Sequence, residues 1–335
     1  MDFIQLNPWD DCPGSLSVRI ISKTGIRDRV EACIQNPGER PALKACIPRC
    51  AEGNVLTTFT LAFLLIAATA LFLIFALGTH PFRSYRRKRL MAMPFPPEWE
   101  QVLNRNVALY RRLPDSLKKQ LQGLIRVFLA EKAFEGCAGL EITDQIKVTI
   151  AAQACILLLN RKPTYYPKLY TILVYPGAYV AKKTTVVHMH HVEERTVRAG
   201  ESWTTGSVVL AWDHVRQEAI DLREGHNVAL HEFAHQLDQE DGRADGAPIL
   251  EKPSSYLAWA RVLSKEYEDL QRKVLSGRPD IMDAYGATNP AEFFAVATET
   301  FFERPNQMKL KHPELYEELK GYFGLNPLEW SENGN

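Results

Sequence analysis

Two histidines and a glutamate lie close together in His231-Glu232-Phe233-Ala234-His235. We expect a helix here, because Asn227 can cap a helix that begins at Val228 and apolar residues recur at helical spacing. Side chains four residues apart are neighbours on a helix, so both imidazoles could bind one Zn²⁺. Glu232 lies about 100° around the helix from His231, where a carboxylate could act as a base on a water ligand of the metal. The alternative is a helix with two ordinary histidines.

A catalytic zinc ion needs a third protein ligand, and a downstream segment offers Glu292. Asn289 can cap a helix there and Pro290 suits its first turn. Glu292 then takes the third helical position, which is also the position of a capping-box glutamate. Glu299, seven residues later on the same face, is a rival ligand or a group that orients one. The spacing leaves these alternatives open.

Other residues could assist this chemistry. Tyr285, in the loop before the second helix, could donate a hydrogen bond to an oxyanion, although an ordinary tyrosine is the alternative. Asp238 is placed to orient a metal ligand. His188, His190 and His191 form a second cluster, which could lie at the edge of the active site or on a surface strand.

The composition is that of a folded protein, with 46% apolar and 24% charged residues among 335. Lysine and arginine number 40, as do aspartate and glutamate, so the net charge is zero. This balance does not favour a nucleic-acid-binding protein, which usually contains a basic domain. We expect a peptide or protein substrate and no nucleic-acid partner.

An uncharged apolar stretch runs from residue 55 to 78 and exceeds the roughly 20 residues that cross a bilayer as a helix. We predict one transmembrane helix here, with a buried helix as the alternative. Basic residues are denser after the stretch than before it, so the positive-inside rule predicts a cytoplasmic C-terminal body. The sequence thus predicts a single-pass protein of the bacterial inner membrane.

Four regions follow from these patterns: an N-terminal segment of undefined role (1–54), the transmembrane helix (55–78), a basic juxtamembrane linker (79–93) and a metallopeptidase domain (94–330). Within this domain we expect helices over 98–112, from 115 and over 144–160, and a buried strand over 171–175. Antiparallel strands are expected over 184–212 and helices thereafter. The predicted fold class is α+β, mainly helical with a small antiparallel sheet.

The motifs together resemble the glucose-regulated zinc metallopeptidases, the family that includes Mlc titration factor A. The resemblance covers roughly residues 94–327. It is carried by Gly139-Leu-Glu-Ile-Thr143, Ala151-Ala-Gln-Ala154, Gly200-Glu-Ser-Trp203, His231-Glu-Phe-Ala-His-Gln-Leu-Asp238, Ala284-Tyr-Gly-Ala-Thr-Asn-Pro-Ala-Glu-Phe-Phe-Ala-Val296 and Phe301-Phe-Glu-Arg-Pro305.

The resemblance implies a zincin-like fold of the gluzincin type, with Zn²⁺ bound by His231, His235 and Glu292. It implies that Glu232 is the catalytic base and that Tyr285 takes part in catalysis. The implied activity is that of a peptidase, with aminopeptidase action on small substrates. The family also includes a protein that binds a transcriptional repressor. The alternative function is therefore a membrane-tethered regulator that binds such a cytoplasmic partner and has weak peptidase activity.

Overall fold

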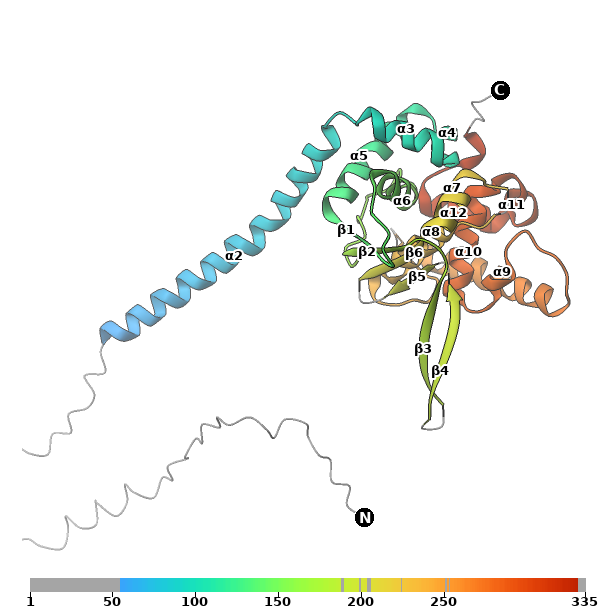
Figure 1. The fold of residues 1–335 in the computed structure, drawn as a ribbon. Coiled ribbons are helices and arrows are strands. Elements are labelled where there is room, and N and C mark those ends of the chain that lie inside the picture. Colours follow the sequence, from blue (N-terminus) through green and yellow to red (C-terminus); the bar gives the residue numbers. More distant parts are fainter. Residues whose placement is uncertain are drawn as a thin grey trace, which may run out of the picture. The chain divides into compact units, whose positions relative to one another are not determined.

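The computed structural model describes residues 55–187, 190–198, 200–203, 206–223, 225–250, 252 and 254–330. The predicted N-terminal segment 1–54 and His188 lie outside the described residues. The chain divides after Phe75 into two units, and the second, from Ala76 to Asn335, contains the sheet and the helices that surround it (Figure 1).

The second unit contains a four-stranded mixed sheet. Its spatial order is β1-β2-β6-β5, in which the first three strands run parallel and β5 pairs antiparallel with β6. The strand β5 therefore forms one edge of the sheet. The inner strands contribute fully buried residues, among them Ile172 and Leu210, to the core. The strands are β1 (Ala133–Gly136), β2 (Thr171–Tyr175), β5 (Gly200–Trp203) and β6 (Ser207–Ala211).

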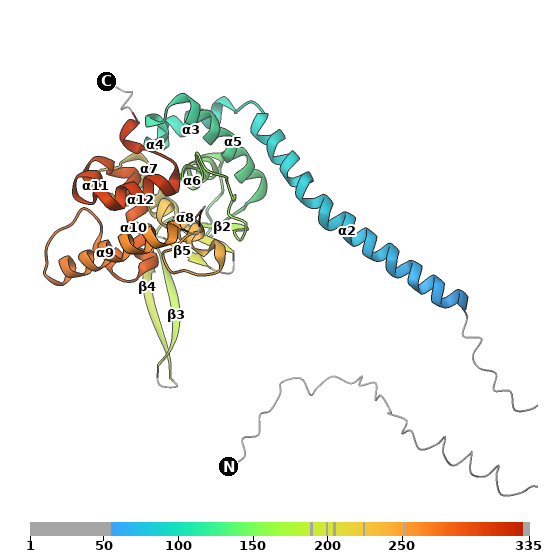
Figure 2. The same ribbon diagram turned by 180° about the vertical axis from the view of Figure 1, so that it is seen from behind.

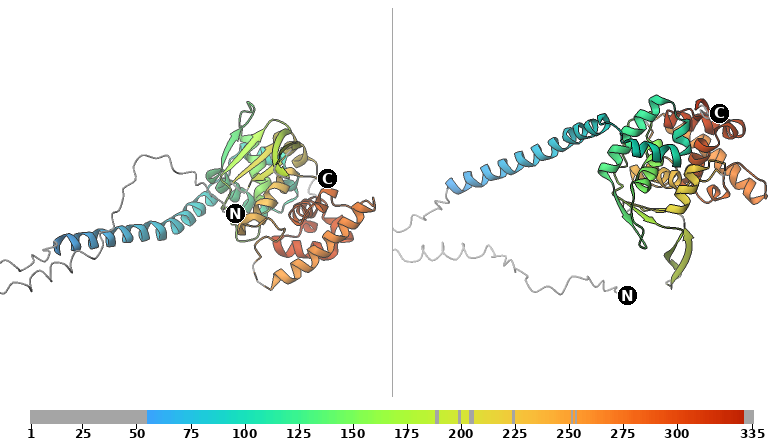
Figure 3. Two further views of the ribbon diagram at one scale, coloured as in Figure 1. Left: turned by 90° about the horizontal axis from the view of Figure 1, so that it is seen from below. Right: turned by 45° about the horizontal axis from the view of Figure 1, so that its top comes forward.

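Helices make up most of the remaining fold, and the C-terminal ones lie together on one side of the sheet in the left view of Figure 3. The helices of this unit are α3 (Pro97–Asn106), α4 (Ala108–Arg112), α5 (Asp115–Glu131), α6 (Asp144–Ile156), α7 (Trp212–Ile220), α8 (Val228–Asp238), α9 (Ser255–Leu275), α10 (Pro290–Glu303), α11 (Pro305–Lys311) and α12 (Pro313–Phe323), together with the short 3-10 helices η2 (Gln239–Asp241), η3 (Ala284–Ala287) and η4 (Pro327–Glu329).

A β-hairpin projects from the rest of the second unit, as Figures 1 and 2 show. Its strands, β3 (Tyr179–Val187) and β4 (His190–Arg198), pair antiparallel. His190 pairs with Val187, and His191 pairs with Val186. The side chains of His190 and His191 lie outside the described part of the chain, so a role for them at the metal stays untested.

The prediction of a mainly helical domain with a small sheet is confirmed, and β2 has the predicted bounds. The antiparallel strands expected over 184–212 are present as the pairs β3–β4 and β5–β6. The sheet as a whole is mixed and not antiparallel as predicted, because β1, β2 and β6 are parallel. Parallel neighbours need a long connection, which α6 provides between β1 and β2. The hairpin and β5 provide it between β2 and β6. The strand β1, which is short and largely exposed, carried no recognisable strand pattern.

Helix α2 (Val55–Ala92) runs through both the predicted transmembrane segment and the basic stretch that follows it. Near its C-terminal end, Arg87 forms a salt bridge of 2.7 Å with Glu131 of α5 and lies over the ring of Tyr165. Among the residues that the structure describes, no helix is sufficiently long and apolar to span a membrane. The structure thus does not support the predicted transmembrane helix 55–78, and the inner-membrane location stays a prediction.

A buried histidine ties together the C-terminal helices. His312 is 2% exposed, and its two ring nitrogens lie 2.7 Å from Glu266 Oε2 and 3.1 Å from Asp280 Oδ1. Asp280 also accepts hydrogen bonds from Lys273 Nζ and from the Met282 backbone. Burial lowers the pKa of His312, but the bonds to the two carboxylates outweigh this effect and raise the pKa to about 9. The imidazolium thereby holds the loop that leads into η3.

We expect the stability conferred by His312 to depend on pH. Its pKa in the folded protein lies above the ordinary value, so its contribution is complete below about pH 6.5 and is lost as the pH rises through about 9. His312→Gln should therefore lower the unfolding free energy by on the order of 3 kcal/mol at pH 6, and by clearly less at pH 10. Urea denaturation of both proteins at the two pH values measures this difference. Equal deficits at pH 6 and pH 10 would contradict the assignment.

Candidate metal centre

Helix α8 carries both histidines of the motif and begins where the sequence predicted. The Asn227 side chain accepts a hydrogen bond from Leu230 N at 2.9 Å and so caps the helix. Leu230 and Phe233 are fully buried in the core, whereas His231 and His235 line a cleft. The apolar stripe thus fixes the rotation of the helix and turns both imidazoles toward the same open space.

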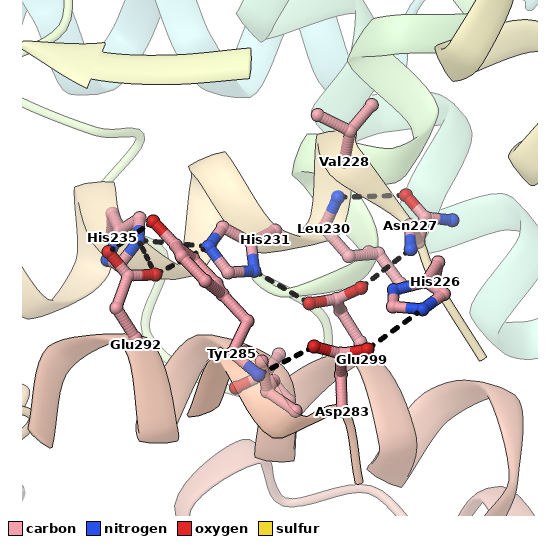
Figure 4. Close-up of polar contacts among 12 residues, drawn as sticks. His226, Asn227, Val228, Leu230, His231, His235, Asp283, Tyr285, Glu292 and Glu299 are labelled. Carbon is pink, nitrogen blue, oxygen red and sulfur yellow. Dashed lines mark hydrogen bonds and ion pairs between the residues drawn. The ribbon is translucent and has the colours of Figure 1, made fainter. Parts of the chain in front are cut away.

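The structure brings His231, His235 and Glu292 together (Figure 4). One ligand atom of each lies within 4.8 Å of the other two. Nε2 of His231 lies 2.9 Å from Glu292 Oε2 and 3.1 Å from Nε2 of His235, which lies 3.2 Å from the same carboxylate oxygen. A tetrahedral zinc ion with bonds of about 2.0–2.1 Å separates its ligand atoms by about 3.3 Å. The three side chains therefore fit a zinc ion.

Glu299 orients His231 and is not a member of this group. Its Oε1 lies 2.7 Å from Nδ1 of His231, on the opposite side of the ring from Glu292. A carboxylate at Nδ1 favours the proton there and leaves the lone pair of Nε2 for a metal. Of the two roles that the sequence left open for Glu299, the geometry favours the orienting one.

Glu299 also anchors the N-terminus of α8 (Figure 4). Its second oxygen, Oε2, accepts a hydrogen bond from the Asn227 backbone N–H at 2.6 Å. Glu303, one turn later on α10, accepts a bond of 3.0 Å from the Asn227 side chain, and Glu218 of α7 accepts one of 2.6 Å from Val228 N. Three carboxylates thus bind donors at the positive end of the helix dipole.

Glu292 is held at the start of α10 as predicted. Asn289 accepts a hydrogen bond from Glu292 N at 3.0 Å, and Pro290 takes the first helical position. The loop after α8 packs closely against this end of α10, because a Cβ added at Gly246 would lie 2.4 Å from the Pro290 carbonyl oxygen. Gly246 also has a φ of +76°, so glycine at this position permits both the close approach to Pro290 and the left-handed backbone conformation.

Asp238 anchors that loop and does not orient a ligand as we had expected. Its Oδ2 accepts a hydrogen bond of 3.0 Å from Gly246 N, and the side chain is fully buried. Burial raises the pKa of Asp238 to about 6. The aspartate therefore links the end of α8 to the start of α10.

Glu232 lies at the buried wall of the cleft and is 6% exposed. Its Oε2 is buried and has no hydrogen-bond partner among the described residues. Burial raises the pKa of Glu232 to about 7, and the negative charges of Glu292 and Glu201 add to the rise, against the neighbouring histidines. A carboxylate with a pKa near neutrality is suited to exchange protons.

The close approach of β5 leaves little space beside Glu232. A Cβ added at Gly200 would lie 2.7 Å from Glu232 Oε1 and 2.5 Å from a methyl group of Val228. Glycine at position 200 thus lets the edge strand come into contact with α8. The sequence alone gave no sign of this contact.

Tyr285 lies at the mouth of the cleft and is 54% exposed. Its hydroxyl is 3.4 Å from Glu292 Oε1, and its ring centre is 6.0 Å from that of His231. Asp283 fixes the start of η3 by accepting a bond from Tyr285 N at 2.6 Å, and it pairs with His226 at 3.2 Å. The hydroxyl is therefore near the candidate metal position.

The electrostatics suit a cation. Burial lowers the pKa of His231, but Glu299 and Glu292 raise it well above the ordinary value. Burial raises the pKa of Glu292, yet its bonds to the two histidines hold it well below the usual range. In this arrangement protons neutralise part of the negative charge. A divalent ion that binds the same nitrogen and oxygen atoms would replace these protons and neutralise the charge in their place.

The cleft has a volume of about 790 Å³ and joins the metal group to the edge strand. Sequence reasoning missed Glu218, Glu303 and the His226–Asp283 pair. One signal was available, since Glu292, Glu299 and Glu303 recur on one face of α10, among residues that are otherwise apolar or small. An acidic stripe on an otherwise buried helix indicates a polar partner.

Comparison with known proteins identifies a family for the chain. A family model described as glucose-regulated metallopeptidase M90 matches residues 82–324. An uncharacterized protein of Synechocystis sp. is 42% identical over 246 residues, which are 73% of this chain and 90% of that protein.

Relatives named Mlc titration factor A are more distant. The protein of Escherichia fergusonii is 30% identical over 69% of this chain and 87% of its own length. That of Klebsiella pneumoniae strain 342 is 31% identical over 70% of this chain and 89% of its own length. The chain belongs to the glucose-regulated metallopeptidase M90 family.

Proposed function

We propose that this protein is a zinc-dependent peptidase of the gluzincin type, with His231, His235 and Glu292 as the metal ligands. The observation that carries the proposal is the convergence of three ligand atoms within 4.8 Å beside a buried glutamate in a cleft. Membership of a metallopeptidase family supports it. When bound, zinc supplies a Lewis acid that activates water and polarises a carbonyl group.

Glu232 is the general base in this proposal. Its buried carboxylate, with a pKa near 7, accepts a proton from the attacking water and passes it to the leaving amine. Tyr285, whose hydroxyl lies beside Glu292, donates a hydrogen bond to the developing oxyanion. Glu299 keeps His231 in the required tautomer.

The edge strand β5 gives an extended substrate a place to bind. On the side away from β6, no strand among the described residues pairs with its backbone groups. Gly200 and Glu201 of this strand line the same cleft as the metal group. A peptide that adds to the edge would present its backbone carbonyls to Glu232 and the metal ligands. This arrangement supports peptides over compact small molecules as substrates.

A regulatory role is the second candidate. The relatives at 30% and 31% identity are named for titrating Mlc, and the aligned region covers 87% and 89% of their lengths. We infer that this chain could bind a transcriptional repressor through the same domain. Sedimentation with purified Mlc would test the inference. If the wild type and Glu232→Gln form the complex equally well, binding of Mlc does not depend on hydrolysis.

Glu299→Gln should weaken zinc binding by about 10- to 100-fold. Glu299 accepts bonds from two N–H groups, at His231 and Asn227, and an amide has only one acceptor oxygen for them. Competition with a chromogenic chelator measures the affinity. Glu135→Gln, an exposed residue on β1, is the matched control and should leave the affinity unchanged. Equal zinc affinities of the wild type, Glu299→Gln and Glu135→Gln would contradict the orienting role of Glu299.

Glu232→Gln should retain about one zinc ion per chain and lose roughly 10²- to 10⁴-fold in kcat, because the amide cannot accept the proton. Metal analysis and cleavage of a fluorogenic peptide library measure the two properties. Full activity in this variant would rule out Glu232 as the base.

Tyr285→Phe should lower kcat by about a hundredfold with little change in KM, since the lost hydrogen bond forms with the transition state. Steady-state kinetics on the best peptide of the library measures both constants. A rise in KM at constant kcat would instead assign Tyr285 to substrate binding.

A further inference from the structure

A second cavity, of about 800 Å³, opens where α4, the segment after α7 and the junction of α10 with α11 meet. Figure 2 shows these helices on the same side of the unit. The cavity shares no lining residue with the cleft of the metal group. We call it the arginine pocket, because its lining includes Arg111, Arg112, Arg223 and Arg304. The cleft, in contrast, has no lysine or arginine among the described residues that line it.

The arginine pocket carries an excess of positive charge. Its described lining contains four guanidinium groups and two carboxyl groups, those of Asp221 and Glu303. Asp221 binds Arg223 Nε, at 2.8 and 3.0 Å from its two oxygens. Burial raises the pKa of Glu303 well above its ordinary value, so this group adds little negative charge. Four positive charges against at most two negative ones leave an excess of at least two. Such an excess favours an anionic ligand.

Two of the arginines are held in place by groups that do not neutralise them. Arg304 donates hydrogen bonds to the carbonyl oxygens of Arg223, at 2.7 Å, and Ile281, at 3.3 Å. Arg111 donates one of 3.1 Å to the carbonyl oxygen of Asn104. A carbonyl oxygen fixes a guanidinium group but brings no counter-charge, and it uses only one of five N–H groups. Cations that are already fixed lose less conformational freedom when a ligand binds.

Glu303 contributes a buried oxygen at the same pocket. The residue is 5% exposed, and its Oε1 accepts a hydrogen bond of 3.0 Å from the Asn227 side chain. Its Oε2 is buried and has no hydrogen-bond partner among the described residues. Buried polar atoms in folded proteins are nearly always hydrogen-bonded. A hydroxyl group of a bound molecule would supply the donor, so the pocket suits an anion that also carries hydroxyl groups.

The charge excess and the number of arginines indicate a phosphate monoester. Such a group carries about 1.5 to 2 negative charges near pH 7 and presents three acceptor oxygens. It can therefore bind guanidinium groups from several segments at once. A carboxylate has one charge and two oxygens, which one arginine can satisfy. The volume of about 800 Å³ leaves room for the rest of a small molecule.

We propose that the arginine pocket binds a small phosphate monoester with hydroxyl groups and that this ligand is an effector of the metal centre. Glu303 connects the two sites, because its Oε1 binds Asn227, the residue that caps α8. Helix α8 carries His231 and His235. A ligand that orders Glu303 and its neighbours would also order the cap of the metal helix. The proposal does not depend on peptidase activity.

The first test measures binding by calorimetric titration of the full-length protein. The probes are glycerol 3-phosphate, inorganic phosphate and glycerol. Glycerol 3-phosphate should bind more tightly than inorganic phosphate, and glycerol should not bind. Loss of charged hydrogen bonds should weaken binding of glycerol 3-phosphate to the double variant Arg111→Gln/Arg112→Gln by about 10- to 100-fold. The control is Arg272→Gln, at an exposed position of α9 outside the pocket, which should match the wild type.

Three outcomes would overturn the binding site. These are no binding of either phosphate compound, equal binding of glycerol 3-phosphate by the wild type and the double variant, and binding of a glutamate-rich peptide in place of both phosphate compounds. The last outcome would assign the pocket to an acidic protein partner. If urea denaturation shows that the double variant is destabilised, Arg111→Gln alone gives the same comparison, because Arg111 is exposed.

The second test measures the connection between the two sites. Competition with a chromogenic chelator gives the zinc affinity with and without saturating glycerol 3-phosphate. Because phosphate compounds also bind zinc in solution, the double variant provides the reference. The ligand should tighten zinc binding by about fivefold or more in the wild type relative to that variant, as is typical of coupled sites. An equal change in both proteins would overturn the effector role.

Discussion

The contact of Glu299 with two donors on α8 is the interaction on which the site depends. One carboxylate oxygen faces His231 Nδ1 at 2.7 Å, and the other accepts the Asn227 N–H at 2.6 Å. The same side chain thus sets the tautomer of a ligand and fixes the end of the helix that carries it. Because Glu292 lies two turns earlier on α10, any shift between the helices would separate Glu292 from the histidines as well. The metal geometry is therefore a consequence of how α8 packs on α10.

Burial of several carboxylates at this contact has a cost that the structure offsets locally. Glu299, Glu303 and Glu218 converge on the first turn of α8, where N–H groups lack helical partners and the dipole is positive. Burial raises the pKa of Glu303 well above its ordinary value, and Glu299 adds to the rise, so this carboxyl group can be neutral. A neutral member lowers the repulsion among the three. The helix N-terminus and the acidic cluster stabilise each other, and neither would be favourable alone.

Much of this arrangement could be predicted from the sequence, because its signals are local. The caps Asn227 and Asn289 fixed where both helices begin, and the spacing of His231 and His235 fixed their common face. The choice of Glu292 depended on family resemblance, since a capping-box glutamate has the same position. The parallel order of β1, β2 and β6 was missed because strand direction depends on pairing between distant segments. The contact of Gly200 with Glu232 was missed for the same reason.

The order of the strands explains why one wall of the cleft is a strand edge. The parallel strands β2 and β6 lie inside the sheet, and β5, which pairs antiparallel with β6, forms the edge next to α8. Only glycine at position 200 lets that edge approach α8, since a Cβ would meet Glu232 and Val228 within 2.8 Å. The strand that could align a peptide is thereby brought beside the carboxylate that could act on it. The position of β5 and the position of the metal ligands therefore both depend on the packing of α8 between the sheet and α10.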